Sequence, residues 1–355
     1  MPRPDTMPSE KDIEALKTRA VAEIVTPEEL DEALKLPNPK AYIGFEPSGK
    51  AHIAWLMMAD KVIDLTRCGF HVDILMADWH AYINDKLGGD IDKIKKCGKY
   101  MEDCFNAMGI DKDRTKYFYA SDYIGDPKYW ELVLRVGKAS SLSRVKRALT
   151  IMGRKEDEAE LDSSKFIYPL MQVADIFYLK VDVALGGIDQ RKAHMLARDT
   201  CKAVGFKAPV ALHTPLNAGL LGAGRMDPSE AKMSKSKPES AIFLHDNADE
   251  VNRKLKNAFC PEKVVEGNPV MDIARNILFS RLPVLEIKRP AKFGGDVQFE
   301  SYATLEKTFV EGKLHPMDLK KGVSEALNKI MDPIRDYFVK HPDNLKIVES
   351  FKTTR

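Results

Sequence analysis

The chain has 355 residues, 44% of them hydrophobic and 30% charged, which is typical of a globular protein of about two domains. Its formal net charge of +2 gives no indication of a nucleic-acid partner. The sequence has no apolar run of roughly 20 residues and no apolar signal region, so we expect neither a membrane-spanning nor a secreted protein. Five cysteines without a Cys-x-x-Cys pair predict reduced thiols, no bound zinc and a cytoplasmic location.

Residues 1–38 are expected to form an N-terminal helical extension. Within it Thr26 is a predicted N-cap, Pro27 suits the first helical position and Glu29 closes a capping box. From Ala41 to Pro215 short apolar runs then alternate with amphipathic segments. The predicted strands are 41–47, 70–78, 115–121, 181–187 and 209–215, and the predicted helices are 52–69, 91–109, 165–180 and 189–205. This alternation predicts an α/β fold with a doubly wound parallel sheet over residues 39–240, with an insertion at about 120–165.

The pattern changes after residue 240. Residues 319–338 place apolar side chains on one helical face: Leu319, Val323, Leu327, Ile330 and Ile334. We therefore expect a smaller, mainly α-helical domain over residues 241–355.

Two glycine-bearing turns follow predicted strands and are candidates for phosphate or ribose binding. The first, residues 44–55, contains Gly44 and leads into a helix at about His52, whose dipole and imidazole suit a phosphate. The second, "GGIDQRK", offers Gly187 for close approach and Asp189 as a ribose acceptor. An ordinary strand-to-helix turn, with Asp189 as an N-cap, is the simpler alternative.

Basic residues cluster in two further places. The stretch "AKMSKSKP", residues 231–238, has three lysines and no acidic residue, which suits either a mobile phosphate clamp or a solvated loop. The window 132–155 has seven basic residues and no acidic one, which suits either a phosphate-contacting face or a solvated helix face.

Together these features resemble the class I aminoacyl-tRNA synthetases. "KMSKS", residues 232–236, matches the lysine loop of that class, and "HIAW", residues 52–55, matches its HIGH element in part, with Ala54 and Trp55 as departures. The segments "YIGFEPSGKAHIAW", "YPLMQVADIFYLKVDVALGGIDQRKAHMLAR" and "LHPMDLKKGV" are similar to signatures of the archaeal and eukaryotic tyrosyl-tRNA synthetase family, over about residues 41–338.

The resemblance implies a tyrosine pocket and an ATP site. Tyr42 and Asp175 would take the phenol hydroxyl, Tyr168, Gln172 and Gln190 the α-ammonium group, while Leu75, Ala77 and His80 form the wall. ATP would enter as its magnesium complex. The residues that would hold it are Gly44, His52, Gly187, Asp189, Lys232, Met233, Ser234, Lys235 and Ser236. His52, Lys232 and Lys235 would be the catalytic residues. Independently, Tyr168, Gln172 and Asp175 share one helical face, which indicates a polar ligand site; Tyr42 has a simple core position as its alternative.

The resemblance also implies partners. A homodimer is expected to form near residues 120–165, and tRNA(Tyr) is expected to bind two groups of residues. The acceptor end would meet Arg144, Lys146, Arg147 and Arg191, and the anticodon would meet Phe293, His315, Met317 and Asp318 in the C-terminal domain. A capped helix start is the alternative for Asp318.

The implied activity is a two-step tyrosine–tRNA ligase reaction through tyrosyl-AMP. A tryptophan enzyme of the same class, and a catalytically silent relative that only binds tRNA, remain as alternatives. Trp55 keeps the silent relative open, while the intact lysine loop counts against it.

Overall fold

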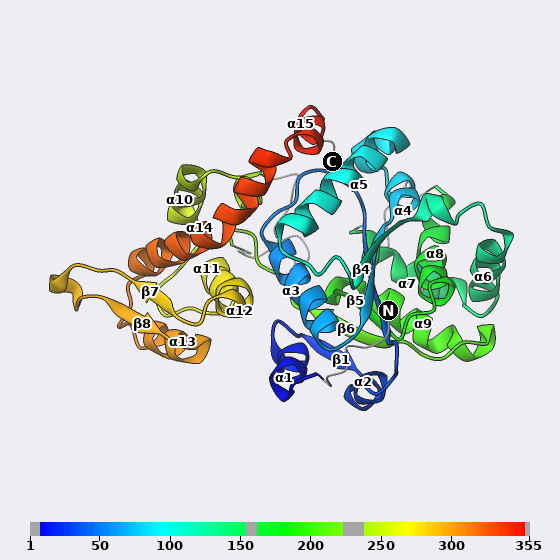
Figure 1. Cartoon of the computed structure of the whole chain (residues 1–355), viewed down its shortest axis with the longest axis horizontal. Helices are drawn as coiled ribbons and strands as arrows, with labels where there is room; N and C mark the ends of the chain where they lie inside the picture. Colours follow the sequence, from blue (N-terminus) through cyan, green and yellow to red (C-terminus); the bar gives the residue numbers. More distant parts are fainter. Residues whose placement is uncertain (1–7, 154–161, 223–237, 352–355) are drawn as a thin grey trace.

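A computed structural model of the chain describes residues 8–153, 162–222 and 238–351. Figure 1 shows an α/β body built on a central sheet and a mainly helical part beside it. Residues 232–236 of the predicted lysine loop lie outside the described ranges, together with their site assignments.

The sheet has six strands in the order β1-β6-β5-β2-β3-β4. Their bounds are β1 Glu23–Val25, β2 Lys40–Phe45, β3 His71–Met76, β4 Thr115–Tyr119, β5 Val183–Gly187 and β6 Val210–Thr214. The five predicted strands are β2 to β6, and they are parallel. The predicted doubly wound sheet is therefore confirmed, with β1 added antiparallel to β6.

Helices cover both faces of this sheet (Figure 1). The helices α3 (Ala54–Arg67) and α5 (Ile91–Ala107) share a core with Ala41 and Ile43 of β2. On the opposite face, α8 (Ser164–Tyr178) and α9 (Arg191–Val204) share a second core with Tyr42. Because successive side chains of a strand point to opposite faces, β2 contributes to both cores.

The N-terminal segment contains α1 (Glu10–Thr18), β1 and α2 (Pro27–Ala33). Thr26 and Glu29 form the predicted capping box at α2. The strand β1 was not predicted; it ties this segment to the sheet through its pairing with β6.

Three further helices contact α8: α4 (Asp78–Ile83), α6 (Pro127–Lys138) and α7 (Leu142–Ala148). The helices α6 and α7 pack on α8 and α9. The described 3-10 turns are Lys86–Gly89, Ala120–Asp122, Leu149–Met152, Ile188–Gln190, Pro238–Ser240 and Ala291–Phe293, and a π turn spans Ala274–Leu278.

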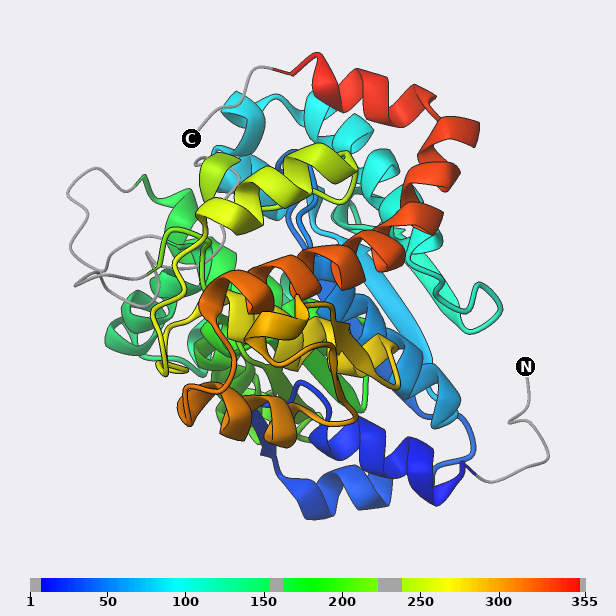
Figure 2. The ribbon, with the colours of Figure 1, turned by 90° about the vertical axis from the view of Figure 1, so that its left-hand side faces the viewer.

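The C-terminal part is mainly helical, as predicted. Its helices are α10 Ala248–Asn257, α11 Pro269–Ile273, α12 Phe279–Arg281, α13 Tyr302–Val310, α14 Pro316–Lys340 and α15 Asp343–Glu349, and its one described hairpin pairs β7 Leu285–Ile287 with β8 Val297–Phe299. The predicted apolar face of α14 is buried in the same core as α3 and α5. The helix α14, orange to red in Figure 2, runs from the C-terminal part to α5, and α15 also packs on α5. No helix among the described residues is long and apolar enough to cross a membrane.

Candidate active site

Predicted ligand residues gather at the carboxyl ends of β2, β3 and β5. The strands β2 and β5 are parallel neighbours, and the chain runs outward from them in opposite directions. The crevice above such a reversal of strand order is the usual ligand site of an α/β sheet. Gly44 lies near the end of β2, Ala77 directly follows β3 and Gly187 ends β5. The fold therefore brings these predicted residues to one edge.

His80 of α4 and Asp175 of α8 are direct partners in the interior. His80 Nε2 lies 3.1 Å from Asp175 Oδ2, and both side chains are almost wholly buried. Burial by itself lowers the pKa of His80, but the charge and hydrogen bond of Asp175, helped by the charge of Glu46, raise it above its ordinary value. His80 therefore faces the buried Asp175 carboxylate directly, in addition to its predicted place in the pocket wall.

Tyr42 is wholly buried on β2, on the same face as Leu75, Ala77 and Tyr168. Burial raises the pKa of its phenol, the charge of Asp175 raises it further, and a hydrogen bond with Gln172 acts in the opposite direction. Tyr42 is thus a protonated hydroxyl within the electrostatic reach of Asp175, and it also belongs to the core.

The three predicted ammonium-site residues, Tyr168 and Gln172 of α8 and Gln190 of the 3-10 turn before α9, make separate hydrogen bonds. Tyr168 donates its hydroxyl to Glu46 Oε1 at 2.7 Å, and Gln172 Nε2 donates to Gln190 Oε1 at 3.2 Å. Gln190 Nε2 in turn donates to the carbonyl of Ile151 at 3.2 Å. Gln172 Oε1 is buried and has no hydrogen-bond partner among the described residues. This arrangement leaves one buried acceptor on the helical face that the sequence singled out.

The sequence reasoning missed Glu46, which is the centre of a polar cluster. Its carboxylate accepts from Tyr168 and from Asn84 Nδ2 at 2.9 and 3.1 Å, and Lys86 Nζ lies 3.5 Å away. One signal was available, because an acidic residue directly after a buried strand in an α/β sheet lies at the ligand-binding edge. Tyr123 and Tyr129, which both bond Asp175, were also missed.

The HIGH-like element differs from its prediction in two respects. The helix α3 begins at Ala54, two residues after the predicted start, and the backbone of His52 forms a β-bridge with Phe243. Trp55 is 6% exposed and packs on Phe45 and Phe105, with ring centroids 4.8 and 5.5 Å apart. Trp55 is therefore a core residue, and of the two departure positions only Ala54 is partly exposed.

The two glycines at the end of β5 leave room for neighbouring side chains. A Cβ atom at Gly186 would lie 3.1 Å from atoms of both Gln190 and His194, and one at Gly187 would lie 2.5 Å from Asp189 Oδ1. The side chains of Gln190, His194 and Asp189 therefore lie close to the backbone at these two glycines. Asp189 lies in a 3-10 turn and does not cap α9, whose N-cap is Gln190 without a side-chain hydrogen bond, so the capping alternative is wrong.

Comparison with known proteins identifies the family. The family model of the class I tRNA synthetases (W and Y) matches residues 35–332. A curated tyrosine–tRNA ligase of Aeropyrum pernix is 50% identical over 350 residues, which are 95% of this chain and 96% of the relative. One of Sulfurisphaera tokodaii is 53% identical over 327 residues, 90% of each chain. The chain belongs to this synthetase family.

Solved structures agree with the assignment to the archaeal tyrosyl-tRNA synthetases. The crystal structure of that enzyme from Aeropyrum pernix matches this synthetase with a TM-score of 0.87 and 45% identity, over 97% of this chain and 99% of the other. The Pyrococcus horikoshii enzyme complexed with L-tyrosine matches with a TM-score of 0.89 and 40% identity, over 96% and 99%. A tryptophanyl-tRNA synthetase at 20% identity and a TM-score of 0.67 shows a shared fold alone.

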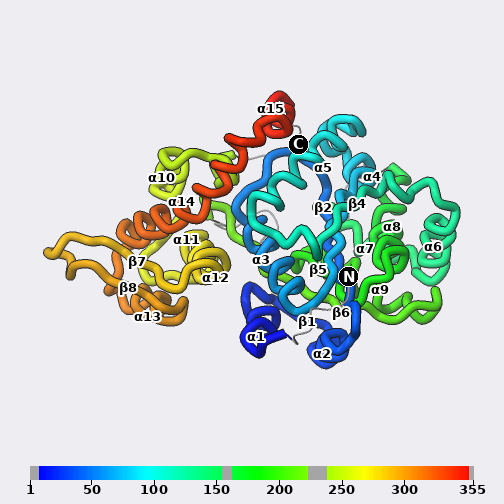
Figure 3. The backbone as a smooth tube through the Cα atoms, in the orientation of Figure 1, coloured from blue at the N-terminus to red at the C-terminus, as the bar shows by residue number. Residues whose placement is uncertain are grey.

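The residues assigned to tRNA lie in two distant regions of this synthetase. Arg144 of α7 pairs with Asp199, and Arg191 of α9 pairs with Glu23 at 2.8 Å. Phe293 is 57% exposed and ends the 3-10 turn between β7 and β8, two strands that Figure 3 shows at the end of the molecule away from α7 and α9. The structure places the two groups far apart, and their contacts with tRNA stay a prediction.

Within the second group the helix-start alternative is partly confirmed. His315 caps α14 by accepting the Met317 N–H at 3.2 Å, and Asp318 lies in the first turn of that helix. Met317 nevertheless remains 46% exposed. Lys146 and Arg147 lie in the last turn of α7.

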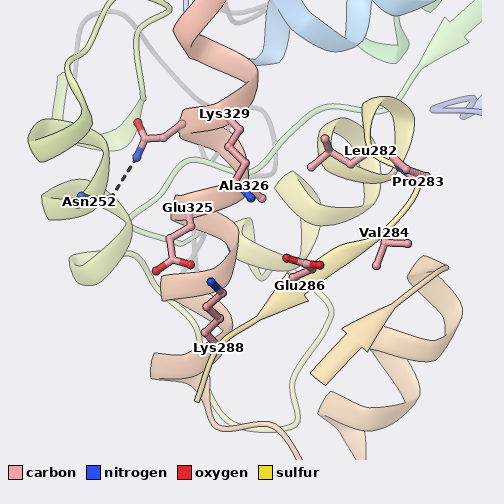
Figure 4. Close-up of a pocket in the computed structure, with 10 residues that line it drawn as sticks. Asn252, Leu282, Pro283, Val284, Glu286, Lys288, Glu325, Ala326 and Lys329 are labelled. Carbon is pink, nitrogen blue, oxygen red and sulfur yellow. Dashed lines mark hydrogen bonds between the residues drawn. The ribbon is translucent and has the colours of Figure 1, made fainter. Parts of the chain in front are cut away.

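A cavity of about 700 Å³ lies in the C-terminal part (Figure 4). None of the residues predicted to bind the substrate tyrosine lines it. It is lined by Asn252, Leu282, Pro283, Val284, Glu286, Lys288, Glu325, Ala326, Asn328 and Lys329. Over the described ranges no group of three or more His, Cys, Asp and Glu side chains is placed to hold a metal.

Proposed function

We propose that the protein activates L-tyrosine with ATP and transfers it to tRNA(Tyr). In the first step a carboxylate oxygen of tyrosine attacks the α-phosphorus of ATP, and pyrophosphate leaves with the electrons of the broken P–O bond. In the second step a hydroxyl of the terminal adenosine of the tRNA attacks the tyrosyl carbonyl, and AMP leaves. The observation that carries the choice of tyrosine is the buried Asp175 carboxylate, which faces His80 at the sheet edge.

Asp175 and Tyr42 are assigned to the phenol hydroxyl of the substrate. The support is their burial and their electrostatic coupling in one pocket. A phenylalanine ring would leave the buried carboxylate without one hydrogen bond, and an unsatisfied buried polar group costs about 1–3 kcal/mol, more if it is charged. Discrimination against phenylalanine follows from this cost. The pocket wall is assigned to Leu75, Ala77 and His80.

The α-ammonium group is assigned to Tyr168, Gln172 and Gln190. Gln172 Oε1 is a buried acceptor with no partner in the described chain, and an ammonium group is a donor of three hydrogen bonds. The Glu46 carboxylate, joined to Tyr168 at 2.7 Å, adds negative charge at the same end of the pocket. We add Glu46 to the ammonium site for this reason.

The ATP site is assigned to the edge formed by the β2 and β5 turns. Gly44 and His52 would hold the triphosphate, while Gly187 and Asp189 would hold the ribose. The lysine loop would close over the phosphates through Lys232, Met233, Ser234, Lys235 and Ser236, with Lys232 and Lys235 stabilising the leaving pyrophosphate. Magnesium would enter with ATP, because phosphate oxygens are its usual partners in such sites.

The tRNA is assigned to two separate regions, and the second subunit is assigned to the 120–165 segment, which includes α7. The acceptor end would meet the basic side chains of α7 and α9, and the anticodon would meet the exposed Phe293 and Met317, since splayed RNA bases stack on such side chains. Leu134 and Leu142 of the 120–165 segment are 71% and 73% exposed, which supports a homodimer through this segment. A cytoplasmic location stays a prediction.

Amino-acid-dependent ATP–pyrophosphate exchange tests the proposal. The purified full-length chain should exchange label with tyrosine and much less with phenylalanine or tryptophan, and it should then charge tRNA(Tyr). Exchange with tryptophan in place of tyrosine would identify the related tryptophan enzyme. No exchange with any amino acid, together with intact tRNA binding, would identify the silent relative.

A further inference from the structure

Two tyrosines share one oxygen of the buried Asp175 carboxylate. Tyr123, directly after the turn that follows β4, donates its hydroxyl to Asp175 Oδ1 at 2.8 Å. Tyr129 of α6 donates to the same oxygen at 2.9 Å, with the carbonyl of Met171 as a longer alternative at 3.4 Å. His80 Nε2 approaches the other oxygen, Oδ2, at 3.1 Å. The carboxylate is therefore held asymmetrically.

The acceptor capacity of Asp175 shows where a ligand can bind. An ionised carboxylate has about four lone-pair sites, two on each oxygen. Tyr123 and Tyr129 use both sites of Oδ1, and His80 lies against Oδ2. Among the described donors none is assigned to the remaining site on Oδ2. An incoming hydroxyl is therefore directed to Oδ2 and away from Oδ1.

We propose that Tyr123 and Tyr129 are positioning residues that orient Asp175 so that Oδ2 receives the substrate hydroxyl, and that they thereby set the selectivity for tyrosine over phenylalanine. This inference rests on the proposed function. It assigns to the 120–165 segment a role inside the tyrosine pocket, in addition to the subunit contact that the family resemblance implies.

The protonation and packing of both residues fit this role. Burial raises the pKa of Tyr123 and of Tyr129, and the negative charge of Asp175 raises each further, so both remain O–H donors throughout the neutral range. Their rings meet edge to face with centroids 5.0 Å apart. Such contacts fix the direction of each hydroxyl, and therefore the rotation of the carboxylate.

Tyr178 supplies a matched control from the same aromatic cluster. Its ring packs on Tyr123 and Tyr129 with centroid distances of 5.0 and 5.6 Å. Its hydroxyl, however, donates to Asp126 Oδ2 at 2.9 Å rather than to Asp175. Loss of the Tyr178 hydroxyl therefore disturbs the same cluster without removing a donor from Asp175.

The experiment compares Tyr123→Phe, Tyr129→Phe and Tyr178→Phe in the full chain by pyrophosphate exchange with tyrosine and with phenylalanine. A hydrogen bond to a charged group contributes enough free energy that its loss changes an equilibrium by about ten-fold or more. For Tyr123→Phe and Tyr129→Phe we therefore expect the KM for tyrosine to rise about ten-fold, with a similar fall in the ratio of kcat/KM for tyrosine to that for phenylalanine. The KM for ATP should stay unchanged, and Tyr178→Phe should keep the parental selectivity.

Unchanged selectivity in both single variants and in the double variant Tyr123→Phe/Tyr129→Phe would overturn the inference. An equal loss of selectivity in Tyr178→Phe, or a parallel rise in the KM for ATP, would also overturn it, because either result indicates general disruption of the fold. The activity of the parent enzyme distinguishes a failure of this inference from a failure of the proposed function. If the parent shows no tyrosine-dependent exchange, the proposed function fails and this inference fails with it, whereas normal parental exchange with unaltered variants removes the inference alone.

Discussion

Trp55 occupies a position where the class pattern has an imidazole, and its surroundings explain the difference. The indole ring packs against both Phe45 at the end of β2 and Phe105 of α5, in the core that α3 shares with the sheet. An imidazole there would be smaller and polar, and it would lack the ring contacts of the indole. In the proposed function, phosphate contacts of this element would therefore be made by His52 and by backbone groups, while Trp55 anchors the start of α3 in the core.

Replacing Trp55 by histidine is expected to restore the class pattern without improving catalysis. Truncation of a buried tryptophan costs about 3–5 kcal/mol, and a buried imidazole without a partner adds to that cost. We expect Trp55→His to lower the free energy of unfolding by about 3 kcal/mol in urea titrations, with no increase in the exchange rate per folded molecule. Trp55→Phe, which keeps an aromatic ring, should lose less. A faster exchange rate at unchanged stability would show that the indole limits catalysis.

At the scale of elements, the strand β1 connects the N-terminal segment to α9. The Glu23 carboxylate accepts from Arg191 Nε at 2.8 Å and lies 3.0 Å from His213 Nδ1, while His213 Nε2 lies 3.0 Å from His194 Nδ1. Because a carboxylate only accepts, it holds the proton of His213 on Nδ1, so that Nε2 accepts from His194. Burial lowers the pKa of both histidines, to about 3 for His194, so both imidazoles are neutral at physiological pH.

Glu23→Gln is expected to loosen the start of α9. The variant removes the charge that binds Arg191 and no longer fixes the tautomers of His213 and His194. We therefore expect the free energy of unfolding to fall by about 1–2 kcal/mol. Because the turn with Asp189 and Gln190 directly precedes Arg191, the KM for ATP should rise as well. Steady-state exchange at varied ATP measures this effect.

Glu29→Gln is the control, because Glu29 joins α2 to Arg198 further along α9 at 2.7 Å, and Gln preserves the capping box. It should lose stability with the KM for ATP unchanged. The same KM shift in both variants would contradict a specific role for Glu23.

Hydrophobic periodicity was sufficient to predict β2 to β6 and their helices, because each buries an apolar face of several residues. It failed for β1, since three residues carry no period and the pairing with β6 depends on segments almost 190 positions apart. In the candidate site the helical spacing in α8 located Gln172 and Asp175. It gave no indication of Tyr123 and Tyr129, whose contacts with Asp175 span 52 and 46 residues.

At the scale of the molecule, the two predicted domains share one hydrophobic core. Residues of α14 belong to the same buried cluster as those of α3 and α5, and Tyr337 donates to Asp103 of α5 at 3.1 Å. His245 lies where the two domains meet. Its ring is 6.2–6.3 Å, centroid to centroid, from Phe243, from Tyr100 of α5 and from Phe338 of α14. Neither ring nitrogen of His245 has a hydrogen-bond partner in the described part of the chain.

This histidine makes the stability of the whole chain depend on pH. Burial, followed by the nearby charge of Lys50, lowers the pKa of His245 to about 4, against an ordinary value of 6.5. Its contribution is therefore present above about pH 6.5 and is lost as the pH falls towards 4, because the unfolded chain takes up the proton first. His245→Phe, with an apolar ring that fits among Tyr100, Phe243 and Phe338, should abolish this share of the dependence.

Urea titrations at pH 7 and 5.5 measure the effect on the free energy of unfolding. We expect the parent to lose about 1 kcal/mol more than His245→Phe over this interval, because one proton is bound by the unfolded state alone. His341→Gln, which removes an exposed histidine from the end of α14, controls for the loss of a histidine in general and should keep the parental dependence. Equal losses in the parent and in His245→Phe would mean that the junction admits the charged imidazole, and that the shared core is less closed than the contacts of His245 indicate.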